Sequence, residues 1–267
     1  MRKRRSIALL LVLAAVLVGI IYFLPPREPV YAGEPLSHWL KGYDPVEGSE
    51  PGRQKADEIM REAGTNAIPT LLRMLREHDS AWKLKLIALA QKQHVINIQH
   101  VEAWRRNRQA MSALEALGSA GKAALPALME IYETNLSASS QYRIAEIFAS
   151  MGPAARPAIP LLLRSVTSTN DPTRAGAVHA LGRIHSEPEK VVPALIFCLH
   201  DPNQGIRSYA TMALGEFGSE AKEAVPELIE AFRDPDRALS SSAYGALQEI
   251  DSETAARVIA ENQQAVN

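Results

Sequence analysis

The sequence has one cysteine, few aromatic residues and no marked excess of charge. Cys198 is the only cysteine, so no disulfide can form within the chain. Aromatic residues make up 6% of the chain and apolar residues 46%, so alanine and leucine supply most of the apolar content, which favours helices over sheets. Four of the 29 Lys and Arg residues lie in "MRKRR", and the remainder carries 25 basic against 30 acidic residues. This balance argues against a nucleic-acid partner.

Motifs of catalysis and metal binding are also missing. No G-x-S-x-G occurs, and "GSAGKAA" (118–124) has Ala116 and Ala123 where a phosphate-binding loop requires Gly and Ser or Thr. No two histidines are spaced i, i+4, although His94 and His100 flank "VINIQ" and leave a metal site there as an alternative. We therefore predict no catalytic residue, no metal and no cofactor, and interpret Cys198 as a packed thiol.

One long apolar run stands at the N-terminus. Residues 6–24 contain no charge, and 19 helical residues span about 28 Å, close to the thickness of a bilayer core. Arg2, Lys3, Arg4 and Arg5 precede the run. By the positive-inside rule, residues 1–5 form a cytoplasmic head and residues 6–24 a single transmembrane anchor. The sequence thus predicts a protein of the cytoplasmic (inner) membrane whose remaining chain lies on the outer or periplasmic side.

A cleaved signal peptide is the alternative reading of the same segment. Val30-Tyr31-Ala32 would suit a cleavage site. The apolar run is longer than the core of most signal peptides, and Pro25-Pro26 separate it from Ala32, which favours the uncleaved anchor. Either reading gives the same topology.

A proline-bearing segment recurs five times, as in "AVPELIEAF" (224–232). The five prolines, which are spaced 57, 34, 33 and 33 residues apart, are Pro69, Pro126, Pro160, Pro193 and Pro226. A near-constant period of this length indicates stacked helix pairs. We predict that each proline lies in the first turn of a helix, where N–H groups have no intrahelical acceptor.

Apolar residues surround each proline in a helical stripe. Positions −1, +2, +3 and +6 are apolar in all five copies, as in Val192, Leu195, Ile196 and Leu199. A second stripe precedes the last four prolines at −16, −13, −12 and −9. The pattern therefore predicts two helices in each repeat, both with one buried face.

Glycine and Asp-Pro pairs mark the ends of the first helices. Gly118, Gly152 and Gly218 follow the second stripe, with His185 at the equivalent place in one copy, and we predict a left-handed residue there. Asp-Pro occurs at 171–172, 201–202 and 234–235. We expect each Asp to cap a first helix and each Pro to be its first residue.

The repeated pattern "D-P-x…A-x-x-A-L-G-x-x-G…A-V-P-x-L", as in "DPNQGIRSYATMALGEFGSEAKEAVPELIEAF", resembles HEAT-like repeats. The resemblance covers residues 52–263. "YAGEPLSHWLKGYDP" (31–45) is similar to a segment of bacterial membrane-anchored HEAT-repeat proteins. The resemblance implies an all-α fold: an α-solenoid of about five to six HEAT-like antiparallel helix pairs, preceded here by one N-terminal transmembrane helix.

The remaining segments complete this organisation. Residues 25–51 are predicted to be a linker with a short helix at Leu36–Leu40, and residues 264–267 a tail. The first spacing exceeds 33 by 24 residues, which places an insertion at about 80–104 within the array of 52–263. We expect a helix at about 81–93, a turn, and a lengthened helix from about 101. Residues 252–263 are predicted to form a final, capping helix.

Position +4 of each second helix is the predicted partner-binding column. We expect the second helices to line the concave side and these side chains to form a ladder of alternating charge, paired with one another or facing a protein partner. The column consists of Arg73, Glu130, Arg164, Phe197 and Glu230.

The densest basic cluster outside the head is "WRRNR" (104–108). Arg105, Arg106 and Arg108 spread around a helix, so a solvated helix face is one reading. The other is contact with an anionic surface such as lipid headgroups.

These observations favour a non-enzymatic scaffold that binds a protein partner and reaches the membrane through residues 6–24. An elongated array offers a large surface and no deep pocket, which suits binding better than catalysis. Two alternatives stay open. One is an enzyme, because some HEAT-like proteins resemble chromophore lyases, although no catalytic residue carries over to this sequence. The other is a module that binds anionic membrane surfaces.

Overall fold

A computed structural model of the protein describes residues 28–77, 79–92, 102–134 and 138–266. The predicted head (1–5) and anchor (6–24) therefore lie outside the described residues, as do His94 and His100. Among the helices that the structure describes, none combines the length and the apolar content that a membrane crossing requires.

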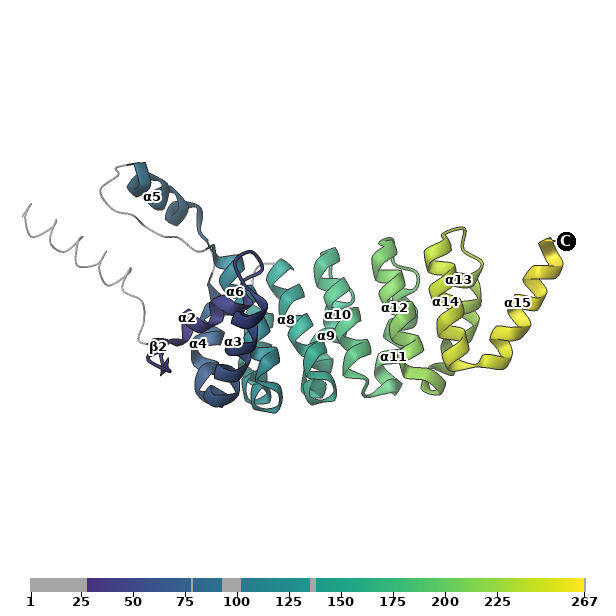
Figure 1. The fold of residues 1–267 in the computed structure, drawn as a ribbon. Coiled ribbons are helices and arrows are strands. Elements are labelled where there is room, and N and C mark those ends of the chain that lie inside the picture. Colours follow the sequence, from purple (N-terminus) through teal and green to yellow (C-terminus); the bar gives the residue numbers. More distant parts are fainter. Residues whose placement is uncertain (1–27, 78, 93–101, 135–137, 267) are drawn as a thin grey trace, which may run out of the picture.

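Six helix pairs follow one another in a single row over the described residues (Figure 1). This agrees with the predicted five to six pairs. Each first helix has 14 residues, which is about four turns. The pairs are α3 (Glu50–Ala63) with α4 (Ile68–Arg76), α6 (Ala103–Ala116) with α7 (Leu125–Thr134), α8 (Ala138–Met151) with α9 (Ile159–Ser165), α10 (Asp171–Ile184) with α11 (Pro188–Cys198), α12 (Gln204–Phe217) with α13 (Val225–Phe232), and α14 (Arg237–Ile250) with α15 (Ser252–Val266).

In five of the six pairs, the two helices are joined by a sharp turn that starts at a residue with a positive φ. Four pairs have a 3₁₀ turn: η2 (Gly64–Ala67), η3 (Gly118–Ala124), η4 (Gly152–Ala158) and η5 (Gly218–Ala224). The glycine that opens each turn has a φ between 52° and 55°. His185 has a φ of 47° at the equivalent position, an uncommon conformation for a residue with a side chain. The predicted helix-ending positions are thus confirmed.

Four of the five repeat prolines lie in the first turn of a second helix, as predicted. Pro193 is the exception, because α11 begins five residues earlier, at Pro188, and Pro193 lies inside it. No 3₁₀ turn precedes this helix; instead Glu187, at a φ of 54°, ends the connection. The chain therefore re-enters the helix sooner in this repeat than in the others.

The Asp-Pro pairs do not cap helices in the way we expected. Asp171 is the first residue of α10, and the residue before it, Asn170, occupies the cap position. Asp201 and Asp234 lie two residues before the capping positions, and each accepts a hydrogen bond, at 2.8 Å, from the backbone N–H two residues later. The caps themselves are Asn203 and Asp236. Here the short acidic side chain stabilises a turn ahead of the helix.

One continuous hydrophobic core runs through the stack. All twenty stripe residues of the second helices belong to it or pack against it, and most are buried. Position +2 is the most deeply buried, with Leu71, Leu128, Leu162, Leu195 and Leu228 all at 0% exposure. The predicted helix faces are therefore confirmed, because each helix hides its stripe between its partner and the next pair.

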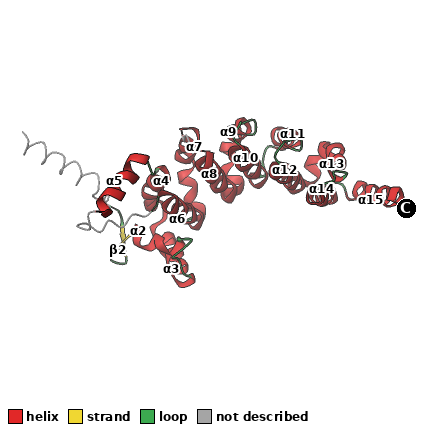
Figure 2. Cartoon of the chain, turned by 90° about the horizontal axis from the view of Figure 1, so that it is seen from above, coloured by secondary structure: helices red, strands yellow, loops and turns green. Residues whose placement is uncertain are grey.

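The array forms a shallow arc with the first helices on its inner side (Figure 2). From α8 to α14 the first helices pack closely on one another, whereas successive second helices barely touch. The expectation that second helices line the concave side is therefore wrong. Neighbouring helices can approach only as closely as their side chains allow, and the first helices carry the smaller residues at their contacts.

Three glycines account for the close packing of the inner side. A Cβ atom on Gly176 of α10 would lie 3.1 Å from the Cβ of Ala145 and from the Cα of Tyr142, both in α8. A Cβ atom on Gly182 of α10 would lie 2.6 Å from the Cβ of Ala213 in α12. A Cβ atom on Gly215 of α12 would lie 3.2 Å from the Cα of Ala246 in α14. Glycine lets these helix backbones come closer than any side chain would permit, which shortens the inner side and curves the stack.

The segment before the array closes its N-terminal end. β1 (Val30–Tyr31) and β2 (Glu34–Pro35) form an antiparallel hairpin, followed by α2 (Leu36–Trp39) and η1 (Leu40–Tyr43). Leu36 and Leu40 are fully buried, and the Trp39 indole N–H donates to the Tyr31 carbonyl oxygen at 2.8 Å. Because η1 packs on both α3 and α6, this segment covers apolar surface that the first pair would otherwise expose.

The insertion contributes α5 (Ala81–Lys92), the extra helix that the sequence predicts. It lies apart from the row of pairs (Figure 1). The lengthened helix expected from about 101 is not found among the described residues, because α6 has the same 14 residues as every other first helix.

Candidate functional site

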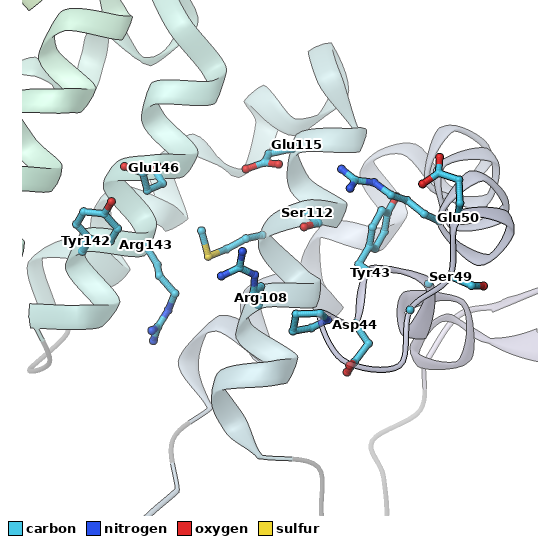
Figure 3. A pocket seen from close by; sticks show the side chains of 15 residues that line it. Tyr43, Asp44, Ser49, Glu50, Arg108, Ser112, Glu115, Tyr142, Arg143 and Glu146 are labelled. Atoms are coloured by element: carbon cyan, nitrogen blue, oxygen red, sulfur yellow. The ribbon is translucent and has the colours of Figure 1, made fainter. Parts of the chain in front are cut away.

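A groove of about 630 Å³ opens between α6, α8 and residues 42–53, which comprise the end of η1, the connecting loop 44–49 and the start of α3 (Figure 3). Here α8 contacts α6 much less than it contacts α10, and the contact between α10 and α12 is also larger. Glu115 in α6 occupies the position that Gly182 and Gly215 occupy in α10 and α12, eleven residues before the repeat proline. A charged side chain there prevents the close approach that glycine allows, so the inner surface is open at this pair.

One wall of the groove is held in place by Asp44. Its carboxylate accepts hydrogen bonds from Arg105 Nε at 3.0 Å, Arg105 Nη2 at 2.6 Å and Gln109 Nε2 at 2.9 Å, all on α6. It also accepts from the backbone N–H groups of Val46 and Glu47. These hydrogen bonds, that of Arg105 foremost, hold the pKa of the Asp44 carboxyl well below its usual range. The loop of residues 44–49 is thereby fixed against α6.

The same wall is tied to α3. The Tyr43 hydroxyl donates to Asp57 Oδ1 at 2.6 Å, and burial together with this bond raises the pKa of Tyr43. Gly42 lies against the backbone of Gly52, where a Cβ atom would collide with the Gly52 carbonyl oxygen. In this wall, the backbone of Gly42 packs on that of Gly52. The hydrogen bonds of Tyr43 with Asp57 and of Asp44 with Arg105 stabilise it.

Three arginines line the groove, one from each helix around it: Arg53 on α3, Arg108 on α6 and Arg143 on α8. In the part of the chain that the structure describes, none of them forms an ion pair with a carboxylate. Arg143 Nη2 donates to Ser140 Oγ at 3.2 Å, and burial lowers the pKa of its guanidinium. Arg53 and Arg108 lie near enough to Glu115 to lower the pKa of its carboxyl, but within the described residues they form no ion pair such as that of Arg105 with Asp44.

Carboxylates of α6 and α8 line the other side of the groove. Burial raises the pKa of the Glu115 carboxyl; the charge of Arg53 opposes this rise, Glu146 adds to it, and Arg108 opposes it. Glu146 Oε1 lies 2.8 Å from Nδ1 of His179 on α10. Burial, followed by the Glu146 carboxylate, raises the pKa of Tyr142 to about 12. The groove is therefore polar, with separate cationic and acidic sides.

The predicted partner-binding column lies on the outer side of the arc and is not brought together as a ladder. Arg73 pairs with Glu28 at 3.1 Å and Glu77 at 3.3 Å, outside the column. Glu130 pairs with Arg76 and Arg164 with Glu133, so the column residues do not pair with one another as expected. Phe197 is 62% exposed, and Glu230 is also exposed. Partner binding at these positions stays a prediction.

The basic cluster "WRRNR" does not form one surface. Arg105 is 18% exposed and binds Asp44 and Glu47, and Arg106 binds Glu77 Oε2 at 2.9 Å. Arg108 is exposed and faces the groove. Two of the three arginines thus hold the fold together, which weakens the alternative of an anionic-surface contact here.

Cys198 and the candidate metal ligands add no second site within the described residues. Cys198 is 1% exposed, and burial raises the pKa of its thiol to about 12, as a packed thiol requires. Within the described residues, no three His, Cys, Asp or Glu side chains gather as metal ligands would. The alternative metal site at His94 and His100 lies outside those residues.

Sequence reasoning missed the groove, although one signal was available. Aligning the first helices on their prolines places Ala149, Gly182 and Gly215 in one column with Glu115. A charged residue among small ones marks the pair whose helices cannot pack closely. The contacts of Asp44 with α6 left no such signal, because the residues lie 61 and 65 positions apart in sequence.

Comparison with known proteins agrees with the helix pairs described above. Residues 192–264 match the family model of HEAT repeats. The fold of the chain is that of a HEAT-like α-solenoid. Among solved structures, it is similar to an engineered protein of the Northeast Structural Genomics Consortium, with 17% identity, a TM-score of 0.46, and 81% of this chain and 96% of that chain covered.

The solenoid is also similar to a chain in the complex of CpcE and CpcF of phycocyanin lyase from Nostoc sp. PCC7120. The identity is 20% and the TM-score 0.44, over 88% of this chain and 86% of that chain. No curated protein matches the sequence.

Proposed function

We propose that this solenoid is a membrane-tethered scaffold that binds a protein partner and carries out no chemistry of its own. The observation that carries the proposal is the groove between α6 and α8. It is a preformed opening on the inner surface, and the three arginines that line it have no ion-pair partner among the described residues. Charged groups left uncompensated in a fixed groove are a common feature of recognition surfaces.

The shape of the array supports binding over catalysis. A single row of helix pairs has a large surface for its length, and solenoids use such extended surfaces to contact other macromolecules. The groove is open rather than enclosed (Figure 3). A scaffold needs only complementarity of shape and charge along this surface.

The tether rests on the sequence. The uncharged run at 6–24 and the basic residues before it favour an anchor with the array on the outer side of the cytoplasmic membrane. Protease added to spheroplasts that express the full chain with a C-terminal tag is expected to remove the tag. A tag that stays intact until the membrane is lysed would place the array in the cytoplasm and contradict the proposed topology.

The binding function is tested by crosslinking membranes that contain the tagged full-length protein and identifying the captured proteins. We expect one dominant partner. Two double variants locate the contact: Arg108→Gln with Arg143→Gln in the groove, and Phe197→Ala with Glu230→Ala in the outer column. Arg183→Gln serves as control, because Arg183 is an exposed arginine of a first helix outside the groove.

The outcomes separate the two surfaces. Loss of the partner in the groove variant alone places the contact on the inner side, and loss in the column variant alone places it on the outer side. If wild type captures no protein above the level of an untagged control, the scaffold proposal is wrong.

A further inference from the structure

The charges of the groove are sorted along its length. In Figure 3 the side chains of Arg108 and Arg143 lie on the lower side of the opening, and those of Glu115 and Glu146 on its upper side. The sorting follows from the helices, since both arginines precede the glutamates in α6 and in α8. The two arginines lie at nearly matching positions of the two helices, 18 and 17 residues before the repeat proline, whereas Glu115 and Glu146 lie 11 and 14 residues before it.

The two acidic groups on one side make that side receptive to a cation. Burial raises the pKa of the Glu115 carboxyl, and repulsion by Glu146 adds to the rise, whereas the charges of Arg53 and Arg108 lower it. A ligand ammonium or guanidinium between the two glutamates would relieve this repulsion. On the opposite side, Arg108 and Arg143 lack ion-pair partners in the described chain and would accept a carboxylate.

The spacing of the two sides sets the size of the ligand. Seven residues separate Arg108 from Glu115 along α6, which corresponds to about 10.5 Å at 1.5 Å per helical residue. An extended peptide advances about 3.3 Å per residue, so about three residues cover the same distance. Arg143 and Glu146 on α8 are only three residues, about 4.5 Å, apart, so the distance along α6 is the one that a single amino acid is too short to span.

We infer that the groove binds an extended peptide segment of mixed charge, with an acidic residue at Arg108 and Arg143 and a basic residue three positions away at Glu115 and Glu146. The inference rests on the proposed function, because the segment belongs to the protein partner of the scaffold. Pro45, Met111 and Tyr142 line the groove between the two sides and offer apolar surface to the intervening residues.

Purified full-length protein in detergent micelles is titrated into fluorescein-labelled hexapeptides, and binding is followed by fluorescence anisotropy. The mixed peptides carry Glu and Lys three positions apart, in both orders. The comparison peptides carry two Glu, two Lys or two Gln at the same places. One mixed peptide is expected to bind at least about tenfold more tightly than the Gln peptide, as for two added charge contacts.

Variants assign each end of the peptide. Arg108→Gln with Arg143→Gln is expected to weaken the mixed peptide and the two-Glu peptide about tenfold. Glu115→Gln is expected to weaken the mixed peptide and to leave the two-Glu peptide unchanged or bound more tightly. The control Arg183→Gln is expected to stay within about twofold of wild type for every peptide. Far-UV circular dichroism confirms that each variant is folded.

Three results would overturn the inference: equal affinity for mixed and Gln peptides, an equal loss with Arg183→Gln, or full displacement of the peptide by inorganic phosphate without any effect of Glu115→Gln. The last result would assign the arginines to a simple anion instead. The scaffold proposal is tested separately by capture from membranes, so a captured partner without peptide binding refutes only this inference.

Discussion

The two ends of the stack are built on different contacts. From α8 to α14, first helices meet through glycine and alanine, and the inner surface is closed by backbone packing. At the N-terminal end, Glu115 stands where those helices have glycine, and the buried Asp44–Arg105 ion pair joins the segments instead. The repeats from α8 to α14, here called the regular end, thus give the array its curvature. The segment before the array together with α3 and α6, here called the irregular end, gives it a groove.

This difference suggests that one repeat pattern can produce both a structural unit and a binding unit. Each repeat contacts only its neighbours, so a change at one interface alters local spacing without disturbing the rest. The predictions below test whether the two ends behave as separate units. Cys198 is a natural reporter for the regular end, because its thiol is buried and its alkylation requires that the structure open.

The largest loss of unfolding free energy is expected in the regular end, for Leu195→Ala in α11. Leu195 is fully buried, and the cavity left by truncation typically costs about 2–5 kcal/mol. Urea denaturation and the rate of Cys198 alkylation are the measurements. Phe197→Ala is the matched control on the same helix, since its ring is 62% exposed, and it should change the unfolding free energy little. Equal effects of the two variants would mean that the assigned core face is wrong.

The next effect is expected at the irregular end, for Asp44→Asn. The change removes the negative charge that Arg105 and Gln109 bind. We expect the free energy of unfolding to fall by about 2–3 kcal/mol, which is at the low end for a buried ion pair because Arg105 is partly exposed. Hydrogen exchange followed by mass spectrometry should show faster exchange in residues 36–63, with Cys198 alkylation unchanged. Glu47→Gln is the control, since Glu47 also binds Arg105 but is 72% exposed.

The pH dependence of the same region has a defined sign. The native pKa of Asp44 is below its ordinary value of 3.8, so its contribution is fully present above that pH and is lost as the pH falls below it. The protection factors of residues 36–63, which remove the intrinsic pH dependence of amide exchange, should therefore fall on acidification in wild type and much less in Asp44→Asn. Equal acid sensitivity of the two proteins would contradict the role given to Asp44.

Smaller changes in stability, of opposite sign at Gly182 and Gly245, test the packing of the inner side. Gly182→Ala places a methyl group 2.6 Å from Ala213 and should cost about 1–3 kcal/mol by overpacking. Gly245→Ala, also in a first helix, meets no atom within 4 Å and should stabilise by about 0.5–1 kcal/mol through helix propensity. Thermal melting of both variants is sufficient, and destabilisation by both would show that the close approach at Gly182 is not specific.

The sequence allowed the helix pairs and their buried faces to be predicted because every repeat must hide the same stripe, which makes the spacing periodic. Leu71 and its four equivalents are one example. The direction of curvature was missed because it depends on small residues between helices, such as Gly182, and the proline-centred stripe does not include them. The partners of Arg105 and Arg106, Asp44 and Glu77, were missed because contacts across the fold leave no periodic signal.

The smallest effect is expected on the outer side of the arc, for Arg164→Ala. Arg164 pairs with Glu133, but both side chains are more than half exposed, and an exposed pair contributes less than about 0.5 kcal/mol. The urea midpoint should stay close to that of wild type at low and at high salt. A loss of more than about 1 kcal/mol in the free energy of unfolding would show that the second helices depend on the salt bridge between α7 and α9. The outer side would then restrain the stack as the glycine contacts do on the inner side, and the contrast between the two sides would disappear.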